Sequence, residues 1–285
     1  AATAPPGGRL AHPTDRSWLI RFGAGYVVVA GLALAALLLA PTPALVLALL
    51  LAAVHFGRGE VVTSAERAGQ PPPSPSARWP ETIAYGCVTV GLLLWAKPDL
   101  SDPYVRPLSP WIADGVRQTR GPALALLVVA VVVGLAALVR RRQILDAAEL
   151  GLLAVMFAAA PPLAAFGLYF GCWHAVRHTG RLLDLARRHL ARQQPAGNGR
   201  AAEAPSPVQW SAAAALLARA SVRPTVVALL AVLLLWWGRG LAGLQAEVAV
   251  LLALTFPHAG VVWVLDRHQA VGVGAGRQNG RRDRR

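Results

Sequence analysis

Long apolar runs alternate with short polar stretches along most of the chain. About eight of the runs approach or exceed the length that crosses roughly 30 Å of hydrocarbon as a helix. They lie at 23–40, 44–57, 82–96, 121–139, 144–160, 163–179, 222–237 and 241–265. Pro41, Pro43, Pro161 and Pro162 mark points where one helix ends and the next begins, because proline interrupts helical hydrogen bonding. The pattern predicts an all-α fold, a polytopic transmembrane helical bundle.

The polar segments between these runs are too hydrophilic to lie in lipid. A segment rich in proline and serine at 64–78 and an arginine-rich segment at 180–221 are predicted to be cytoplasmic loops. We expect residues 1–265 to form a single transmembrane helical domain. Residues 266–285 are predicted to be a disordered basic tail, because they carry too little apolar surface to offset the entropy lost on ordering.

The composition also favours a bilayer over water as the main solvent. Hydrophobic residues make up 55% of the chain, charged residues only 15%, and the mean hydropathy is +0.47. The net charge of +14 raises the question of nucleic acid or an anionic membrane surface as partner. Because the arginines lie between apolar runs, we expect a membrane partner and no nucleic acid.

The basic residues indicate an orientation. With a cytoplasmic N-terminus and about eight spans, nearly all of the 28 Lys and Arg residues fall in loops on the inner side. The exceptions are Lys97, Arg106, Arg117, Arg120 and Arg239. Such an imbalance is what the positive-inside rule describes. The sequence therefore predicts a multi-pass protein of the cell (inner) membrane with both termini of this chain in the cytoplasm.

Four of the seven histidines lie within predicted spans or at their ends, where ionisable groups are costly and tend to mark functional sites. His174 and His178 are spaced i, i+4, which places both imidazoles on one helix face. The distances along the sequence to the flanking arginines place all four histidines, His55, His174, His178 and His258, in the inner half of the bilayer. Each histidine alone would more often be a packing residue, but four at one depth favour a metal site.

The donor type narrows the choice of metal. Imidazoles suit iron, copper, zinc or nickel, whereas magnesium and calcium prefer oxygen donors. Glu60 lies close enough after His55 to orient a ligating ring by accepting its hydrogen bond, or it is a plain interfacial charge. Arg177, between the paired histidines, could hold Glu60, but we expect its side chain to extend to the membrane interface.

Aromatic residues surround the paired histidines. Tyr169, Phe170 and Trp173, with Gly171 making room, would suit a slot for a long, flat, apolar ligand beside a metal. The same rings could equally face lipid or a neighbouring helix. Both interpretations stay open from the sequence.

Three short blocks in order carry a resemblance. They are His-Phe-Gly-Arg-Gly-Glu at 55–60, Tyr-Phe at 169–170 followed by His-Ala-Val-Arg-His at 174–178, and Phe-Pro-His at 256–258. With this order, spacing and membrane context, the chain resembles, over about residues 50–265, the Brp/Blh family of bacterial and archaeal β-carotene 15,15′-dioxygenases, which are membrane proteins.

The resemblance implies an activity and a ligand set. It implies Fe(II) held by His55, His174 and His178, with His258 as a fourth ligand or an orienting group. The reaction would split the central double bond of β-carotene with O₂ and release two retinal molecules, with the substrate entering from the lipid bilayer. A rhodopsin that accepts the retinal is a further partner that the sequence leaves open.

One family feature has no counterpart here. Family members begin with a helix carrying a Pro-His-Gly block whose histidine is counted among the iron ligands. His12 stands in His-Pro order in a basic stretch and does not match it. We therefore expect that the sequence lacks an N-terminal span and that its metal site is incomplete. The alternatives are a metal-binding membrane transporter and a catalytically inactive, carotenoid-binding family member.

Overall fold

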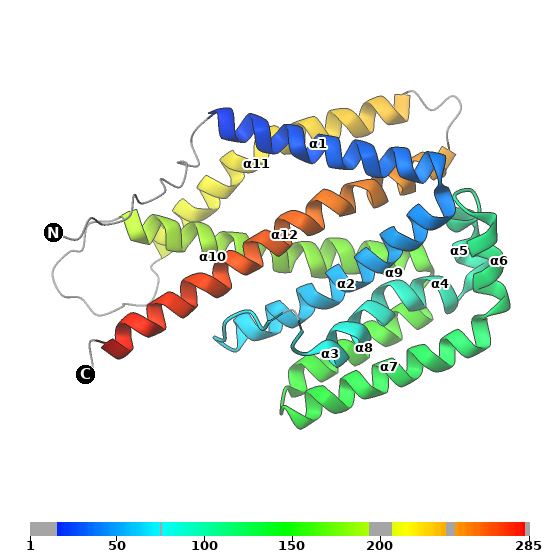
Figure 1. Ribbon diagram of the computed structural model, residues 1–285, viewed down its shortest axis with the longest axis horizontal. Coiled ribbons are helices and arrows are strands. Elements are labelled where there is room, and N and C mark those ends of the chain that lie inside the picture. The colour runs from blue at the N-terminus through cyan, green and yellow to red at the C-terminus, as the bar shows by residue number, and fades with distance from the viewer. Residues whose placement is uncertain (1–15, 75, 194–206, 238–242, 283–285) are drawn as a thin grey trace, which may run out of the picture.

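The structure, a computed structural model, describes residues 16–74, 76–193, 207–237 and 243–282, and these residues contain no strand. Figure 1 shows the helices packed along one another, with α2 lying between α12 and α3 and with α7 along one edge. Residues 1–15, which include His12, lie outside the description. The predicted all-α membrane fold is confirmed.

Most of the helices follow the apolar runs of the sequence. The first half contains α1 (Arg16–Leu39), α2 (Pro41–Arg67), α3 (Trp79–Gly86), the π turn η1 (Cys87–Gly91), α4 (Leu92–Trp95), α5 (Pro98–Val105), α6 (Pro110–Gln118) and α7 (Arg120–Arg140). The second half contains α8 (Ile144–Ala159), α9 (Pro162–Leu168), the π turn η2 (Tyr169–His174), α10 (Ala175–Gln193), α11 (Pro207–Trp237) and α12 (Gly243–Arg282). Several of these helices begin at proline, whose fixed φ suits the first helical turn.

Within the described residues, four helical segments are long and apolar enough to cross a bilayer. They are Ile20–Leu39, Pro41–Arg67, Arg120–Arg140 and Val248–Arg267. The predicted spans at 82–96 and 163–179 are also helical, but π turns divide them into shorter segments, and α8 has only 16 residues. The predicted number of spans therefore stays a prediction.

Several boundaries differ from those that the sequence predicts. The arginine-rich segment at 180–221, predicted to be a cytoplasmic loop, is helical over most of its described residues, because α10 continues to Gln193 and α11 begins at Pro207. The second span is predicted to end at residue 57, but α2 continues to Arg67, so His55 lies inside a helix and not near its end. The helix continues because Glu60, Glu66 and Arg67 all have charged partners on neighbouring helices. Likewise, α12 is helical as far as Arg282, within the segment predicted to be a disordered tail.

Close packing fixes α2 against α3. A Cβ atom added at Gly57 would lie 2.0 Å from the backbone oxygen of Thr82, and one added at Gly86 would lie 2.5 Å from that of Ala53. Only glycine allows the two backbones to approach this closely. This contact places the opposite face of α2, which carries His55, toward α10 and α12.

Candidate metal centre

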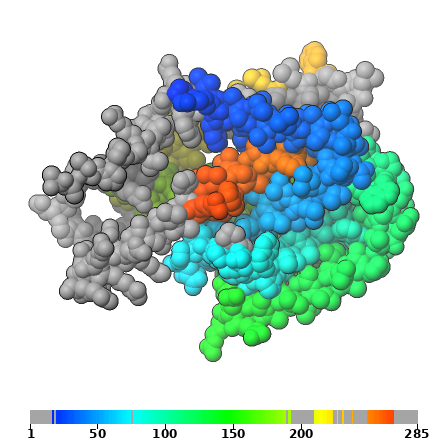
Figure 2. Space-filling view, viewed as in Figure 1, coloured from blue at the N-terminus to red at the C-terminus, as the bar shows by residue number. Residues whose placement is uncertain are grey.

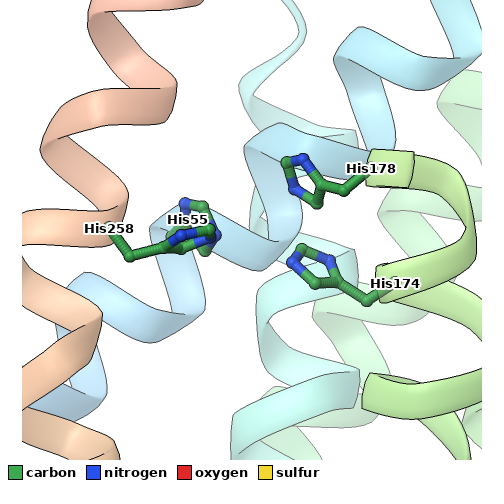
Figure 3. A group of neighbouring side chains, drawn as sticks. All are labelled: His55, His174, His178 and His258. Carbon is green, nitrogen blue, oxygen red and sulfur yellow. The ribbon is translucent and has the colours of Figure 1, made fainter. Parts of the chain in front are cut away.

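Four histidines from three separate parts of the chain meet at one point. His55 comes from α2, His174 from the end of η2, His178 from α10 and His258 from α12. One ring nitrogen of each lies within 4.8 Å of the corresponding nitrogens of the other three. Figure 3 shows the rings directed toward one another from the three helices. The structure thus brings together all four histidines that the sequence singles out.

The spacing of the rings follows from the local backbone. His174 and His178 stand one turn apart on the same helix face, with ring centroids 4.4 Å apart. The rings of His55 and His258, on two other helices, have centroids 5.0 Å apart. His174 closes the π turn η2, a wide turn of the kind that often occurs at functional sites.

Two buried nitrogens are chemically unusual. In the part of the chain that the structure describes, the Nε2 atoms of His55 and His174 are buried without a hydrogen-bond partner. Buried polar atoms are nearly always paired, so two such atoms in one cluster call for a ligand. Both side chains belong to the group whose nitrogens converge, and neutral imidazole nitrogen is a donor for a transition metal. The donor set therefore fits a metal ion.

Aromatic rings line one side of the cluster. The ring of Phe56 meets that of His174 edge-on, with centroids 5.0 Å apart at 90°. Phe170 stacks against His174 at 5.9 Å and against Phe166 at 5.7 Å. Because these rings offer no hydrogen bonds, they limit access of water to the imidazoles from this side and lower the local dielectric.

Glu60 is almost fully buried, with 2% of its surface exposed, and is bound from three sides. Its carboxylate accepts hydrogen bonds from the Tyr169 hydroxyl at 3.1 Å and from Trp173 Nε1 at 3.3 Å, and it pairs with Arg177. None of these donors is a histidine ring. The prediction that Glu60 orients a ligating ring directly is therefore not what the structure shows: Glu60 contacts the helix that carries the rings.

Arg177 does not extend to the membrane interface, so that prediction is wrong. One of its nitrogens pairs with Glu60, and another lies 2.9 Å from Oε1 of Glu149. Its guanidinium also lies 4.2 Å from the ring centroid of Trp173. The buried Glu60 and the partly buried Glu149 hold this side chain between neighbouring helices through charge-assisted hydrogen bonds.

The three aromatic residues predicted to line a slot do not form one open surface. Tyr169 has no exposed area and turns its hydroxyl to Glu60. Trp173 turns its indole N–H to the same carboxylate, whereas Phe170 is 40% exposed. Buried tyrosine and tryptophan need partners for their polar ends, which explains why two of the rings turn to Glu60. A substrate-lining role for these residues stays a prediction.

The sequence did not indicate a second ionic contact on α10. Arg181 pairs with Glu66 at 2.8 Å and with Asp266 at 2.6 Å. It lies one turn after Arg177, which also joins two carboxylates from two helices. The sequence gives one local indication of these contacts: Arg177 and Arg181 are four residues apart and therefore lie on one face of the helix, next to the histidines.

A cavity of about 300 Å³ lies between α2 and α12 beside the histidines. Its lining includes His55, Leu51, Phe256, Trp263, Arg58 and Asp266. A larger apolar cavity of about 510 Å³ lies on the other side of α2, toward α3, and shares Val54 with the first. Figure 2 shows that α2 is accessible on this face of the molecule, with α12 on one side of it. Both cavities border a surface rich in exposed apolar side chains.

The comparisons with known proteins agree with one another. A family model described as beta-carotene 15,15′-dioxygenase matches residues 7–266, which include all four clustered histidines. The chain is also 30% identical over 280 residues to "Probable beta-carotene 15,15′-dioxygenase Blh" of Halobacterium salinarum, covering 89% of this chain and 76% of that protein. No solved structure matches the chain.

Proposed function

The chain belongs to the β-carotene 15,15′-dioxygenase family, and from this we propose that it splits the central double bond of β-carotene with O₂ to give two retinal molecules. The observation that carries the proposal is the meeting of four imidazole nitrogens within 4.8 Å of one another, with His55 and His174 buried among the helices and His258 exposed at the edge of the cluster. A centre of this kind suits oxygen chemistry on an apolar substrate.

Fe(II) is the metal that we propose, held by His55, His174, His178 and His258. The unpartnered buried nitrogens of His55 and His174 support a bound ion. Zinc also accepts imidazole donors but has no redox chemistry, so a reaction with O₂ favours iron over zinc. When bound, iron would supply the activation of O₂.

The protein's own residues would orient the metal and the substrate. Phe56 and Phe170 shield the imidazoles from water, which protects reactive species from side reactions. β-Carotene has no polar group, so recognition must come from the shape of an apolar surface. The cavity beside His55, with Phe256 and Trp263 in its lining, offers such a surface next to the cluster.

We also place the protein in the cell (inner) membrane with both ends of this chain in the cytoplasm. The uneven distribution of Lys and Arg supports this orientation. In a variant without native cysteines, a cysteine at the exposed Asp99 should react with an impermeant maleimide in intact cells. A cysteine at Ser76 should react only after the cells are opened; the reverse pattern would contradict the orientation. A rhodopsin that accepts the retinal stays a proposal without support from the fold.

Retinal formation tests the function. The purified protein should contain iron and convert β-carotene to retinal under O₂, as followed by chromatography. His174→Ala should abolish retinal formation, whereas His189→Ala, a change of the same kind at a histidine of the basic segment after the cluster, should not. Iron and bound carotene without turnover would identify an inactive, carotenoid-binding member. Metal transport without turnover would favour a transporter. Retinal formation by His174→Ala would overturn the assignment.

A further inference from the structure

Two arginines on α10 join that helix to three others. Arg177 pairs with Glu60 of α2 and Glu149 of α8. Arg181, one turn later, pairs with Glu66 of α2 and with Asp266 of α12. His178 lies between the two arginines in the sequence, so ionic contacts surround the part of α10 that carries it.

Glu60 has the largest set of contacts with this helix. Its three donors, Tyr169, Trp173 and Arg177, follow one another at intervals of four residues and therefore lie along one side of the continuous helix formed by α9, η2 and α10. A single buried carboxylate thus fixes which side of that helix faces α2.

The paired histidines lie on the adjacent side. His174 follows Trp173, and His178 follows Arg177, by one residue each. One residue corresponds to about 100° of rotation around an α-helix, and to somewhat less in the wider π turn that contains Trp173 and His174. When the donors to Glu60 face α2 at residue 60, the two imidazoles are turned toward His55 and His258. Any rotation of the helix would separate the rings of His174 and His178 from the other two.

The contacts of Glu60 are themselves held in place by a second layer of charges. Glu149, which shares Arg177 with Glu60, accepts two hydrogen bonds from Arg67 of α2. Arg67 in turn pairs with Asp146 on α8, whose other oxygen accepts a hydrogen bond from Ser64 at 2.7 Å. The ionic network therefore connects α2, α8 and α10, and Glu60 is the member that contacts the π turn beside the histidines.

We propose that Glu60 is a positioning residue that sets the rotation of the helix bearing His174 and His178, so that the four imidazoles already converge before a metal binds. It acts through Tyr169, Trp173 and Arg177 and not through any ring nitrogen. This inference rests on the proposed function, because it assumes that the four histidines bind a metal ion.

Glu81 provides a matched control. It is a fully buried carboxylate that pairs with Arg78 at 3.3 Å and with Arg141 at 2.9 Å, but it belongs to α3. Glu60→Gln and Glu81→Gln therefore remove the same charge from similarly buried, arginine-paired sites. A general loss of stability would affect both variants, whereas loss of positioning would affect only the first.

Metal titration separates these outcomes. The full chain in detergent, stripped of metal, is titrated with Co(II), and the visible absorption spectrum reports the ligand geometry. Glu60→Gln should weaken Co(II) binding by about 10- to 100-fold and change the spectrum, the usual effect of losing a group that supports ligands. Glu81→Gln should keep the wild-type spectrum and a Kd for Co(II) within about twofold of the wild type. Glu60→Asp, which keeps the charge, should recover part of the affinity. An unchanged Kd and spectrum in a folded Glu60→Gln variant would overturn the proposal.

A readout without metal distinguishes failure of the inference from failure of the proposed function. A Cβ atom at Gly59 would lie 3.8 Å from Cε1 of His174. In a background with Cys87 and Cys172 replaced by serine, cysteines at 59 and 174 should be joined by a short bifunctional thiol reagent. Adding Glu60→Gln should lower the cross-linking yield several-fold, and adding Glu81→Gln should not. Equal yields would refute positioning. If the wild type binds no metal but the cysteine pair at 59 and 174 responds to Glu60→Gln as expected, only the iron assignment is refuted.

Discussion

One face of α2 packs against α3, and the opposite face borders the candidate metal centre. Gly57 lies on the first face and Gly59, two residues later, on the second. At Gly57 an added Cβ would lie 2.0 Å from the backbone of α3, whereas at Gly59 its nearest neighbour would be a carbon of the His174 ring at 3.8 Å. One glycine permits helix contact, and the other lies against the candidate metal centre. A single helix therefore combines a rigid packing face with a face that presents chemistry.

The largest effect on iron content and activity is expected from a change on the face of α2 that carries His55. His55→Ala should remove one of the four converging nitrogens without disturbing the contact of α2 with α3. We predict loss of bound iron and of retinal formation, with normal amounts of folded protein in the membrane. Metal analysis and chromatography on the same preparation check this outcome. Full iron content in the variant would mean that His55 is not a ligand.

The packing face should respond in the opposite way. Gly57→Ala forces a methyl group against backbone that cannot move aside, so we expect destabilisation at the upper end of, or beyond, the roughly 1–3 kcal/mol of ordinary overpacking. Gly59→Ala meets only ordinary van der Waals contact and should keep its thermal stability. Thermal unfolding in detergent compares the two variants directly. Equal Tm values would contradict the described difference between the faces.

A milder effect is expected in the cavity between α2 and α12. Gly260 contributes to its lining, and an added Cβ there meets nothing within 4 Å, so a leucine at this position can start without a backbone clash and occupy space at the cavity. If the carotene uses this cavity, kcat/KM should fall about 10-fold, at the low end of what one misplaced apolar group costs. Gly151 on α8 has equally open surroundings, and Gly151→Leu serves as the control. Equal kinetics of the two variants would exclude the cavity as a substrate site.

The smallest effect should come from the polar region at 97–120. Hydrogen bonding from Arg106, at 2.9 Å, lowers the pKa of the Asp102 carboxyl. The ion pair therefore stabilises the fold above the ordinary pKa of aspartate, and this contribution disappears as the pH falls through the lowered value. Asp102→Asn should lower the Tm slightly at neutral pH and not at all in strong acid. A difference in Tm that persists in acid would assign the effect to packing and not to charge.

Local sequence patterns predicted the parts of the molecule that depend on local chemistry. Hydropathy located the apolar helices but not α5, α6 or most of α10, and depth together with the i, i+4 spacing singled out the histidines that converge. The end of α2 at Arg67 could not be predicted, because its charged residues are neutralised by partners far away in the sequence. The burial of Arg177 and the turning of Tyr169 toward Glu60 escaped prediction for the same reason.

X-ray absorption at the iron edge reports which atoms bind the metal. We expect one iron per chain in the purified full-length protein, with a nitrogen shell that shows imidazole scattering and loses part of that scattering in His258→Ala. A shell without imidazole, or protein that keeps no iron while still forming retinal, would contradict the four-histidine centre.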